Sequence, residues 1–122
     1  MAESFEKLKQ RWRAETDARR ARSDHLRGIV RERCVSVFER FGVQKAVIFG
    51  SVAQGRVGAR SDVDLLVLPL KNDVYWEFMH ELEDVLERPV DLYTDRDDPA
   101  WVRKILERGE VVYDARSCAA KG

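Results

Sequence analysis

A chain of 122 residues is long enough for one domain with a single modest core, and it leaves little room for a second substrate-binding domain. Charged residues make up 36% of the chain and hydrophobic residues 44%, which indicates a globular protein with a heavily charged surface. No apolar run approaches the roughly 18 residues that a membrane-spanning helix needs, and a formal net charge of zero does not favour direct nucleic-acid binding.

The charges are distributed unevenly along the chain. Residues 1–45 hold 12 Lys and Arg against 7 Asp and Glu, whereas residues 46–122 hold 10 against 15. A polar molecule of this kind could bind another protein, or a second copy of itself as a homo-oligomer, through charge. Two ordinary solvated surfaces explain the same distribution equally well.

The cysteines and the N-terminus indicate a reducing compartment. Cys34 and Cys118 form neither a CxxC pair nor a metal-binding spacing, so no disulfide is expected, and Cys34 falls in a helical apolar pattern typical of a core. The N-terminus is charged from Glu3 onward, unlike a signal peptide. We therefore expect a cytoplasmic protein.

The first predicted helix covers residues 3–22, which are rich in Glu, Lys, Arg and Ala. Phe5, Leu8 and Trp12 follow helical spacing, but only alanines continue this stripe, so the helix gains little by packing against a core. An exposed Trp12 would indicate a surface for a partner.

A second helix is predicted from the capping residues Ser23 and Asp24 to about Phe41, with Gly42 as its stop. Its apolar residues form a complete helical face: Leu26, Ile29, Val30, Cys34, Val37, Phe38 and Phe41. A face of this width predicts a helix that packs against the core.

Short strands and helices alternate in the rest of the chain. Strands are expected at residues 46–49, 63–68, 90–93 and 111–113, and helices at residues 75–86 and 99–108, with a possible short helix at 51–56. This order predicts an α/β or α+β domain in which a small mixed β-sheet is flanked by helices. The expected organisation is a helical extension, a domain and a tail: residues 1–24, 25–116 and 117–122.

Two tryptophans lie in the helices predicted for the second half. Trp76 is expected to point inward from helix 75–86, together with Met79, Leu82, Val85 and Leu86. Trp101 has the same expected role in helix 99–108. Both are interpreted as core residues rather than as platforms on which a base would stack.

Two aspartates, Asp62 and Asp64, lie at the start of predicted strand 63–68. Side chains alternate between the faces of a strand, so the two carboxylates point the same way. Their repulsion is roughly 4 kcal/mol at ~4 Å and an effective dielectric near 20, which favours a cation between them. Carboxylate oxygens favour Mg²⁺ or Mn²⁺, and two solvated surface carboxylates are the alternative.

Asp91 supplies a third carboxylate. If strand 90–93 pairs beside strand 63–68, Asp91 joins Asp62 and Asp64 on one face. Three carboxylates can hold two metal ions, which stabilise the attacking and leaving oxygens of phosphoryl transfer. Asp91 could then accept the proton of the attacking hydroxyl.

Gly50 and Ser51 follow strand 46–49 and fit a phosphate site. A glycine lets the backbone approach a phosphate closely, the start of a helix offers free N–H groups, and the Ser51 hydroxyl adds a donor. Arg56, in the loop that follows, could also contact phosphates, although a surface role is equally compatible with its position.

Together these residues carry a family resemblance. The pattern is Gly50-Ser51-x-Ala53-x-Gly55 followed by Ser61-Asp62-x-Asp64-Leu65. It resembles the signature of the minimal nucleotidyltransferase (MNT) family of the DNA polymerase beta-like superfamily, over about residues 40–114. The candidate site therefore comprises Gly50, Ser51, Arg56 and Ser61 for the nucleotide, and Asp62, Asp64 and Asp91 for metal ions and catalysis. The helix at residues 1–22 is longer than the family pattern needs.

The resemblance also implies a role and a partner. Many such proteins act as antitoxins beside a HEPN-domain toxin and transfer AMP from ATP to a tyrosine hydroxyl of that toxin. This chain has little room for an acceptor-binding domain, so we expect another protein or a second copy to supply the acceptor. The alternatives are a non-catalytic antitoxin with a vestigial nucleotide site, and transfer to a small molecule such as an aminoglycoside.

Overall fold

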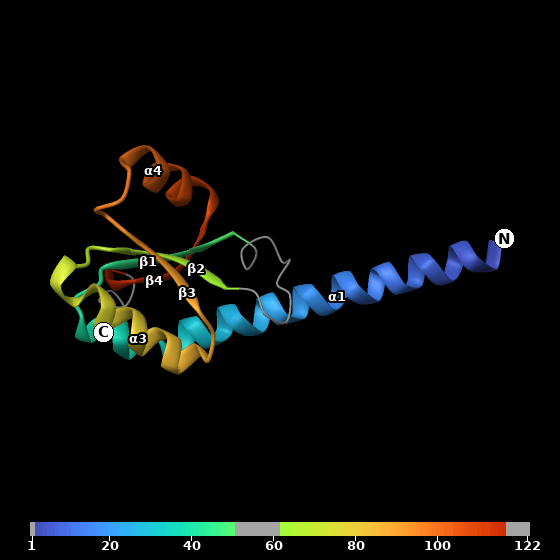
Figure 1. Cartoon of the computed structure of the whole chain (residues 1–122), viewed down its shortest axis with the longest axis horizontal. Coiled ribbons are helices and arrows are strands. Elements are labelled where there is room, and N and C mark those ends of the chain that lie inside the picture. Colours follow the sequence, from blue (N-terminus) through green and yellow to red (C-terminus); the bar gives the residue numbers. More distant parts are fainter. Residues whose placement is uncertain (1, 51–61, 117–122) are drawn as a thin grey trace.

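The computed structural model describes residues 2–50 and 62–116, which form a sheet with helices on both faces (Figure 1). Its strands are β1 (Lys45–Phe49), β2 (Val63–Leu68), β3 (Val90–Thr94) and β4 (Glu110–Asp114). Its helices are α1 (Ala2–Arg33), α2 (Val35–Arg40), α3 (Tyr75–Leu86) and α4 (Pro99–Arg108), with a 3-10 turn, η1 (Asn72–Val74), before α3. The predicted fold class is confirmed, and the predicted helix at 51–56 lies outside the described residues.

The strand order is β3-β2-β1-β4, and the sheet is mixed. β1 pairs antiparallel with β2 and with β4, whereas β2 and β3 run parallel. This confirms that strand 90–93 lies beside strand 63–68. In the resulting register Asp64 is opposite Asp91 on one side and opposite Phe49 on the other. Three elements therefore meet at Asp64.

Each face of the sheet has its own core. The larger core lies between the sheet and helices α1, α2 and α3; its largest fully buried side chains include Phe38, Phe78, Ile48, Leu65 and Leu82. The smaller core lies beneath α4 and contains Val47, Leu66 and Ile105, with Phe49, Leu68, Tyr93 and Val102 packed against it. Because strand side chains alternate, Asp64 and Asp91 face the α4 side, as Leu66 and Tyr93 do.

The predicted break at Ser23 is wrong, because α1 continues from Ala2 to Arg33. The Ser23 hydroxyl donates a hydrogen bond of 3.0 Å to the carbonyl of Arg19, one turn earlier, instead of capping a new helix. Ser23 is fully buried, so this internal bond satisfies its hydroxyl without ending the helix.

The second predicted helix is instead interrupted at Cys34, which separates α1 from α2. The Cys34 amide still donates to Val30 (3.2 Å), so the chain keeps its helical direction. The predicted apolar face is confirmed, since Leu26, Val30, Cys34, Val37 and Phe38 are buried. Burial also raises the pKa of the Cys34 thiol to about 12. Gly42 follows with a positive φ of 75°, as expected of a glycine that ends a helix.

The inward face of α3 differs from the prediction. Trp76 is 66% exposed, and Phe78, which the pattern did not single out, is fully buried with Leu82 and Leu86. Those three residues are spaced four apart along one stripe, and Trp76 lies about 200° around the helix from Phe78. Trp101 is also exposed, at 43%, so neither tryptophan is a core residue.

The first half of α1 protrudes from the domain (Figure 1). Phe5, Leu8 and Trp12 are 53%, 39% and 55% exposed, and burial begins at Ser23. The C-terminal half is held by core residues and by ion pairs of Arg27 (2.9 Å) and Arg31 (3.4 Å) to the carboxylate of Glu110. Despite the length of α1, no helix in the described part of the chain has the apolar character to span a membrane.

Candidate active site

Asp64 and Asp91 form the closest pair of the candidate carboxylates. They are register partners on the parallel strands β2 and β3, and their side chains are close enough for Asp91 to raise the pKa of Asp64. The pKa of Asp64 is raised to about 6, first by burial, then by the charge of Asp91 and the hydrogen bond to it, and last by the charge of Asp62. Two carboxylates this close cannot both ionise without cost, so the pair shares a proton or attracts a cation.

Asp62 lies just before β2, where it is exposed. It acts on Asp64 through charge, and that effect is the smallest of those that raise the pKa of Asp64. Among residues 2–50 and 62–116, no three His, Cys, Asp or Glu side chains converge tightly enough to enclose a metal ion by themselves. Mg²⁺ in phosphoryl-transfer sites commonly takes only one or two carboxylates and completes its shell with phosphate and water oxygens. The Asp64–Asp91 pair fits that requirement.

Gly50 directly follows β1 and lies against Asp64. Its φ of 71° lies in the left-handed region that favours glycine. A Cβ atom added to Gly50 would overlap Oδ2 of Asp64, so any side chain here would displace that carboxylate. Besides the phosphate approach expected from the sequence, glycine is therefore needed to seat Asp64. The other predicted nucleotide-binding residues, Ser51, Arg56 and Ser61, lie outside the described residues.

Two tyrosines near the carboxylates were not singled out by sequence reasoning. Burial raises the pKa of Tyr93, and the charges of Asp91 and Asp64 raise it further. Tyr93 is two residues from Asp91 on the same strand, so the two-residue period of β3 could have placed it on this face. Tyr75, at the start of α3, donates a 2.8 Å hydrogen bond to the carbonyl of Leu92.

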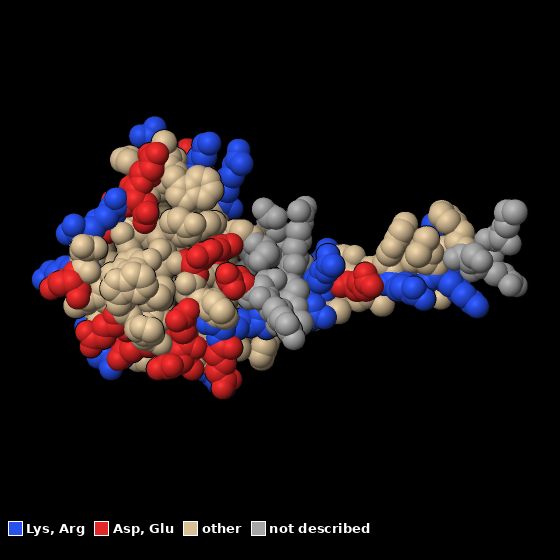
Figure 2. Space-filling model, viewed as in Figure 1, with Lys and Arg blue, Asp and Glu red and all other residues tan. Residues whose placement is uncertain are grey.

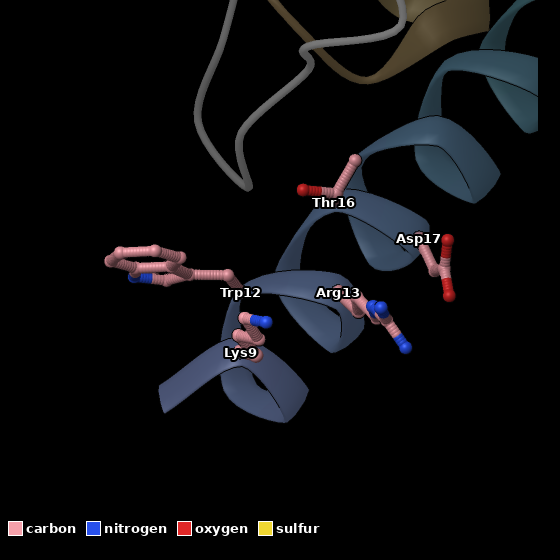
Figure 3. Close-up of a pocket in the computed structure, with 5 residues that line it drawn as sticks. All are labelled: Lys9, Trp12, Arg13, Thr16 and Asp17. Carbon is pink, nitrogen blue, oxygen red and sulfur yellow. The ribbon is translucent and has the colours of Figure 1, made fainter. Parts of the chain in front are cut away.

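A separate hollow lies on the protruding part of α1 (Figure 3). Its described lining comes from this one helix: Lys9, Trp12, Arg13, Thr16 and Asp17. It is remote in sequence from the carboxylate pair and contains a single carboxylate, so we assign it no chemistry.

The mixed sheet, the paired carboxylates on the neighbouring strands β2 and β3 and the glycine that follows β1 are the features of a nucleotidyltransferase domain. Residues 32–117 match the family described as Polymerase beta, Nucleotidyltransferase, which is most of the chain, so the protein belongs to that family. No curated protein sequence matches the chain.

Solved structures with the same fold include components of toxin–antitoxin complexes. One is a toxin–antitoxin crystal structure with AMP-PNP (TM-score 0.60, 23% identity, 69% of this chain and 73% of that chain). Another is a tri-AMPylated Shewanella oneidensis HEPN toxin in complex with MNT antitoxin (TM-score 0.54, 18% identity, 77% of each chain). A third is a minimal nucleotidyltransferase at 26% identity (TM-score 0.54, 77% of this chain and 92% of that chain).

Proposed function

We propose that the protein transfers a nucleoside monophosphate, AMP from ATP, to a hydroxyl group on a partner protein. The observation that carries this proposal is the Asp64–Asp91 pair on the α4 face of the sheet, in which Asp64 is partly buried, has a raised pKa and is seated against Gly50. A carboxylate whose pKa is raised by burial and by a neighbouring carboxylate, as that of Asp64 is, is poised to bind a divalent cation.

In the proposed reaction the acceptor oxygen forms a bond to the α-phosphorus of ATP. The bond from that phosphorus to the bridging oxygen of the β-phosphate breaks, and pyrophosphate leaves. Asp64 and Asp91 would hold Mg²⁺ or Mn²⁺, with Asp62 adding charge nearby, and Asp91 would accept the proton of the hydroxyl. The cation, when bound, supplies positive charge that offsets the triphosphate. Gly50 would let the backbone approach the phosphates, and the Ser51 hydroxyl would donate to them.

The proposed partner is a HEPN-type toxin, with this chain as its antitoxin. The similar solved structures support this, because they include toxin–antitoxin complexes, one with an AMPylated HEPN toxin. The chain itself supports a protein acceptor: the protruding part of α1 exposes Phe5, Leu8 and Trp12 to a partner.

The test is label transfer from α-labelled ATP with Mg²⁺, with the purified chain and the protein encoded by the neighbouring gene both offered as acceptors. We expect label on the neighbour and at least about a hundredfold less with Asp64→Asn, because a metal ligand is lost. Asp84→Asn, an exposed substitution of the same type on α3, is the matched control and should transfer normally. Full activity of Asp64→Asn would contradict the assignment.

A second candidate function is neutralisation of the partner by contact alone. The exposed apolar stripe on α1 favours it, because residues 5–22 also carry seven Lys and Arg against three Asp and Glu, which suits an acidic partner surface. Protection of cells from the toxin by Asp64→Asn, and its loss in Trp12→Ala, would support this function over catalysis.

A further inference from the structure

Three aromatic rings from three elements meet on the α4 face of the sheet, and we call them the aromatic patch: Phe49 of β1, Tyr93 of β3 and Trp101 of α4. Ring centroids are 5.4 Å apart for Phe49 and Tyr93, 6.3 Å for Phe49 and Trp101, and 6.4 Å for Tyr93 and Trp101. The first two pairs meet edge to face, and all three distances lie in the range of favourable aromatic contacts.

The aromatic patch is open to ligands. Trp101 is 43% exposed, and Phe49 and Tyr93 are partly exposed. A tryptophan that only anchored α4 to the sheet would be buried by that contact. The small core beneath α4 instead consists of Val47, Leu66 and Ile105, and Trp101 is not part of it. The exposed ring area of Trp101 is therefore free to contact another flat group.

The aromatic patch also adjoins the carboxylate pair. Phe49 is the direct cross-strand neighbour of Asp64, and such neighbours have Cβ atoms about 4.5–5.5 Å apart. Tyr93 follows Asp91 by two residues on the same face of β3, a rise of roughly 7 Å along the strand. If the phosphates of a ligand lie at the carboxylates and Gly50, a group that is joined to those phosphates through one sugar would reach the rings.

We propose that the aromatic patch binds the base of the nucleoside triphosphate by stacking, with Trp101 as the principal contact. This rests on the proposed function, which supplies the nucleotide. The base is favoured over the ring of an acceptor side chain because its covalent link to the phosphates fixes its distance from the carboxylates. Stacking accepts any base, so we expect ATP, GTP, CTP and UTP all to bind, with the larger purines tighter.

The test compares two probes: ATP, and inorganic tripolyphosphate, which lacks the base. Dissociation constants are measured by calorimetry with Mg²⁺ for the wild type, Trp101→Ala and Trp101→Phe. Loss of one stacking ring weakens base binding at least about fivefold. We therefore expect Trp101→Ala to weaken ATP binding by that factor, to leave tripolyphosphate binding unchanged, and Trp101→Phe to recover most of the loss.

Trp76→Ala is the matched control, because Trp76 is a more exposed tryptophan on α3, across the sheet from α4. It should bind both probes as the wild type does. Tyr93→Leu gives an independent variant in the aromatic patch should Trp101→Ala fail to fold, as judged by its melting temperature, and it should weaken ATP alone.

Three results would overturn the inference. ATP binding could be unchanged in Trp101→Ala and Tyr93→Leu, or both probes could weaken equally. A third is a higher KM for the protein acceptor with unchanged ATP affinity, which would assign the rings to the acceptor. Absence of ATP binding by the wild type would instead contradict the proposed function itself, so the two failures are distinguishable.

Discussion

At the scale of single residues, the raised pKa of Asp64 makes stability depend on pH. Unfolded, this carboxyl has a pKa near 3.8; folded, it is about 6. The folded state therefore holds a proton that the unfolded chain releases. The contribution of this bound proton to the free energy of unfolding is complete below about pH 4, and it is lost as the pH rises through about 6.

Asp64→Asn should remove this dependence, because the amide is neutral at every pH. We expect the variant to exceed the wild type in free energy of unfolding by about 1–2 kcal/mol at pH 7, allowing for partial solvation, with the difference vanishing near pH 4. Urea titrations in EDTA at the two pH values measure this. A variant less stable than the wild type at pH 7 would show that the pair is not repulsive.

Alanine substitutions at Gly50 and Gly42 can separate the effect of backbone strain from the effect of displacing the Asp64 carboxylate. Both have positive φ, 71° and 75°, but only at Gly50 would a Cβ meet Asp64; at Gly42 nothing lies within 4 Å. Each change to alanine should cost about 1–2 kcal/mol of stability. Gly50→Ala should also lower transfer about a hundredfold, because Asp64 moves, while Gly42→Ala keeps its activity. Equal activity of the two folded variants would refute this role of Gly50.

At this scale the sequence predicted the carboxylates by alternation along two strands, and Asp91 needed only the correct pairing of β3 with β2. The second role of Gly50 could not be predicted. It depends on β1 and β2 being antiparallel, with Phe49 opposite Asp64, which no local pattern encodes.

At the scale of elements, α3 shows why the apolar positions in the sequence did not correctly predict which face of a helix is buried. Phe78 is fully buried, and its ring centroid lies 6.2 Å from that of Phe38 and 5.2 Å from that of Phe41, whereas Trp76 is exposed. Apolar residues lie on several sides of this helix, so their spacing alone fits more than one inward face. The face is chosen by the rings of α2 and its end, which are distant in sequence.

We therefore expect Phe78→Ala to reduce the free energy of unfolding by about 3–5 kcal/mol through cavity formation. Trp76→Ala, two residues away on the same helix, should change it by no more than about 0.5 kcal/mol. Chemical denaturation of both variants measures the contrast. A larger loss from Trp76→Ala than from Phe78→Ala would mean that α3 packs on the core with the Trp76 side inward instead of the Phe78 side.

The predicted break in α1 failed for a related reason. Ser23 and Asp24 are good capping residues, but capping is only one use of a serine hydroxyl. Here the surrounding core, from Leu26 onward, holds the helix in place, and Ser23 satisfies its hydroxyl within the preceding turn. Tertiary packing overrides the local signal.

At the scale of the whole molecule, the basic N-terminal part of the sequence includes the protruding helix, whereas the acidic remainder lies in the compact domain. Figure 2 shows Lys and Arg on the lower side of the outer part of the protruding helix with uncharged side chains above them, and acidic side chains nearer the domain. How far α1 extends beyond the domain could not be predicted from the sequence, because the expected break at Ser23 would have allowed the extension to fold back.

Deletion of residues 1–18 should separate the functions of the two parts. These residues precede the first buried side chain, so we expect the melting temperature to change little. ATP binding should be retained, and binding to the protein of the neighbouring gene should fall at least about tenfold, because the exposed Phe5, Leu8 and Trp12 are lost. Unchanged partner affinity of the folded deletion variant would assign the docking surface elsewhere.

The most direct test of the account is Mn²⁺ binding followed by electron paramagnetic resonance with a non-hydrolysable ATP analogue present, since it requires no knowledge of the acceptor. We predict that the wild type binds Mn²⁺ together with the nucleotide, and that Asp64→Asn and Asp91→Asn each weaken this binding at least about tenfold, while Asp84→Asn does not. If the wild type and both site variants bind Mn²⁺ equally weakly, the Asp64–Asp91 pair is not a metal site, and the proposed nucleotidyl transfer loses its basis.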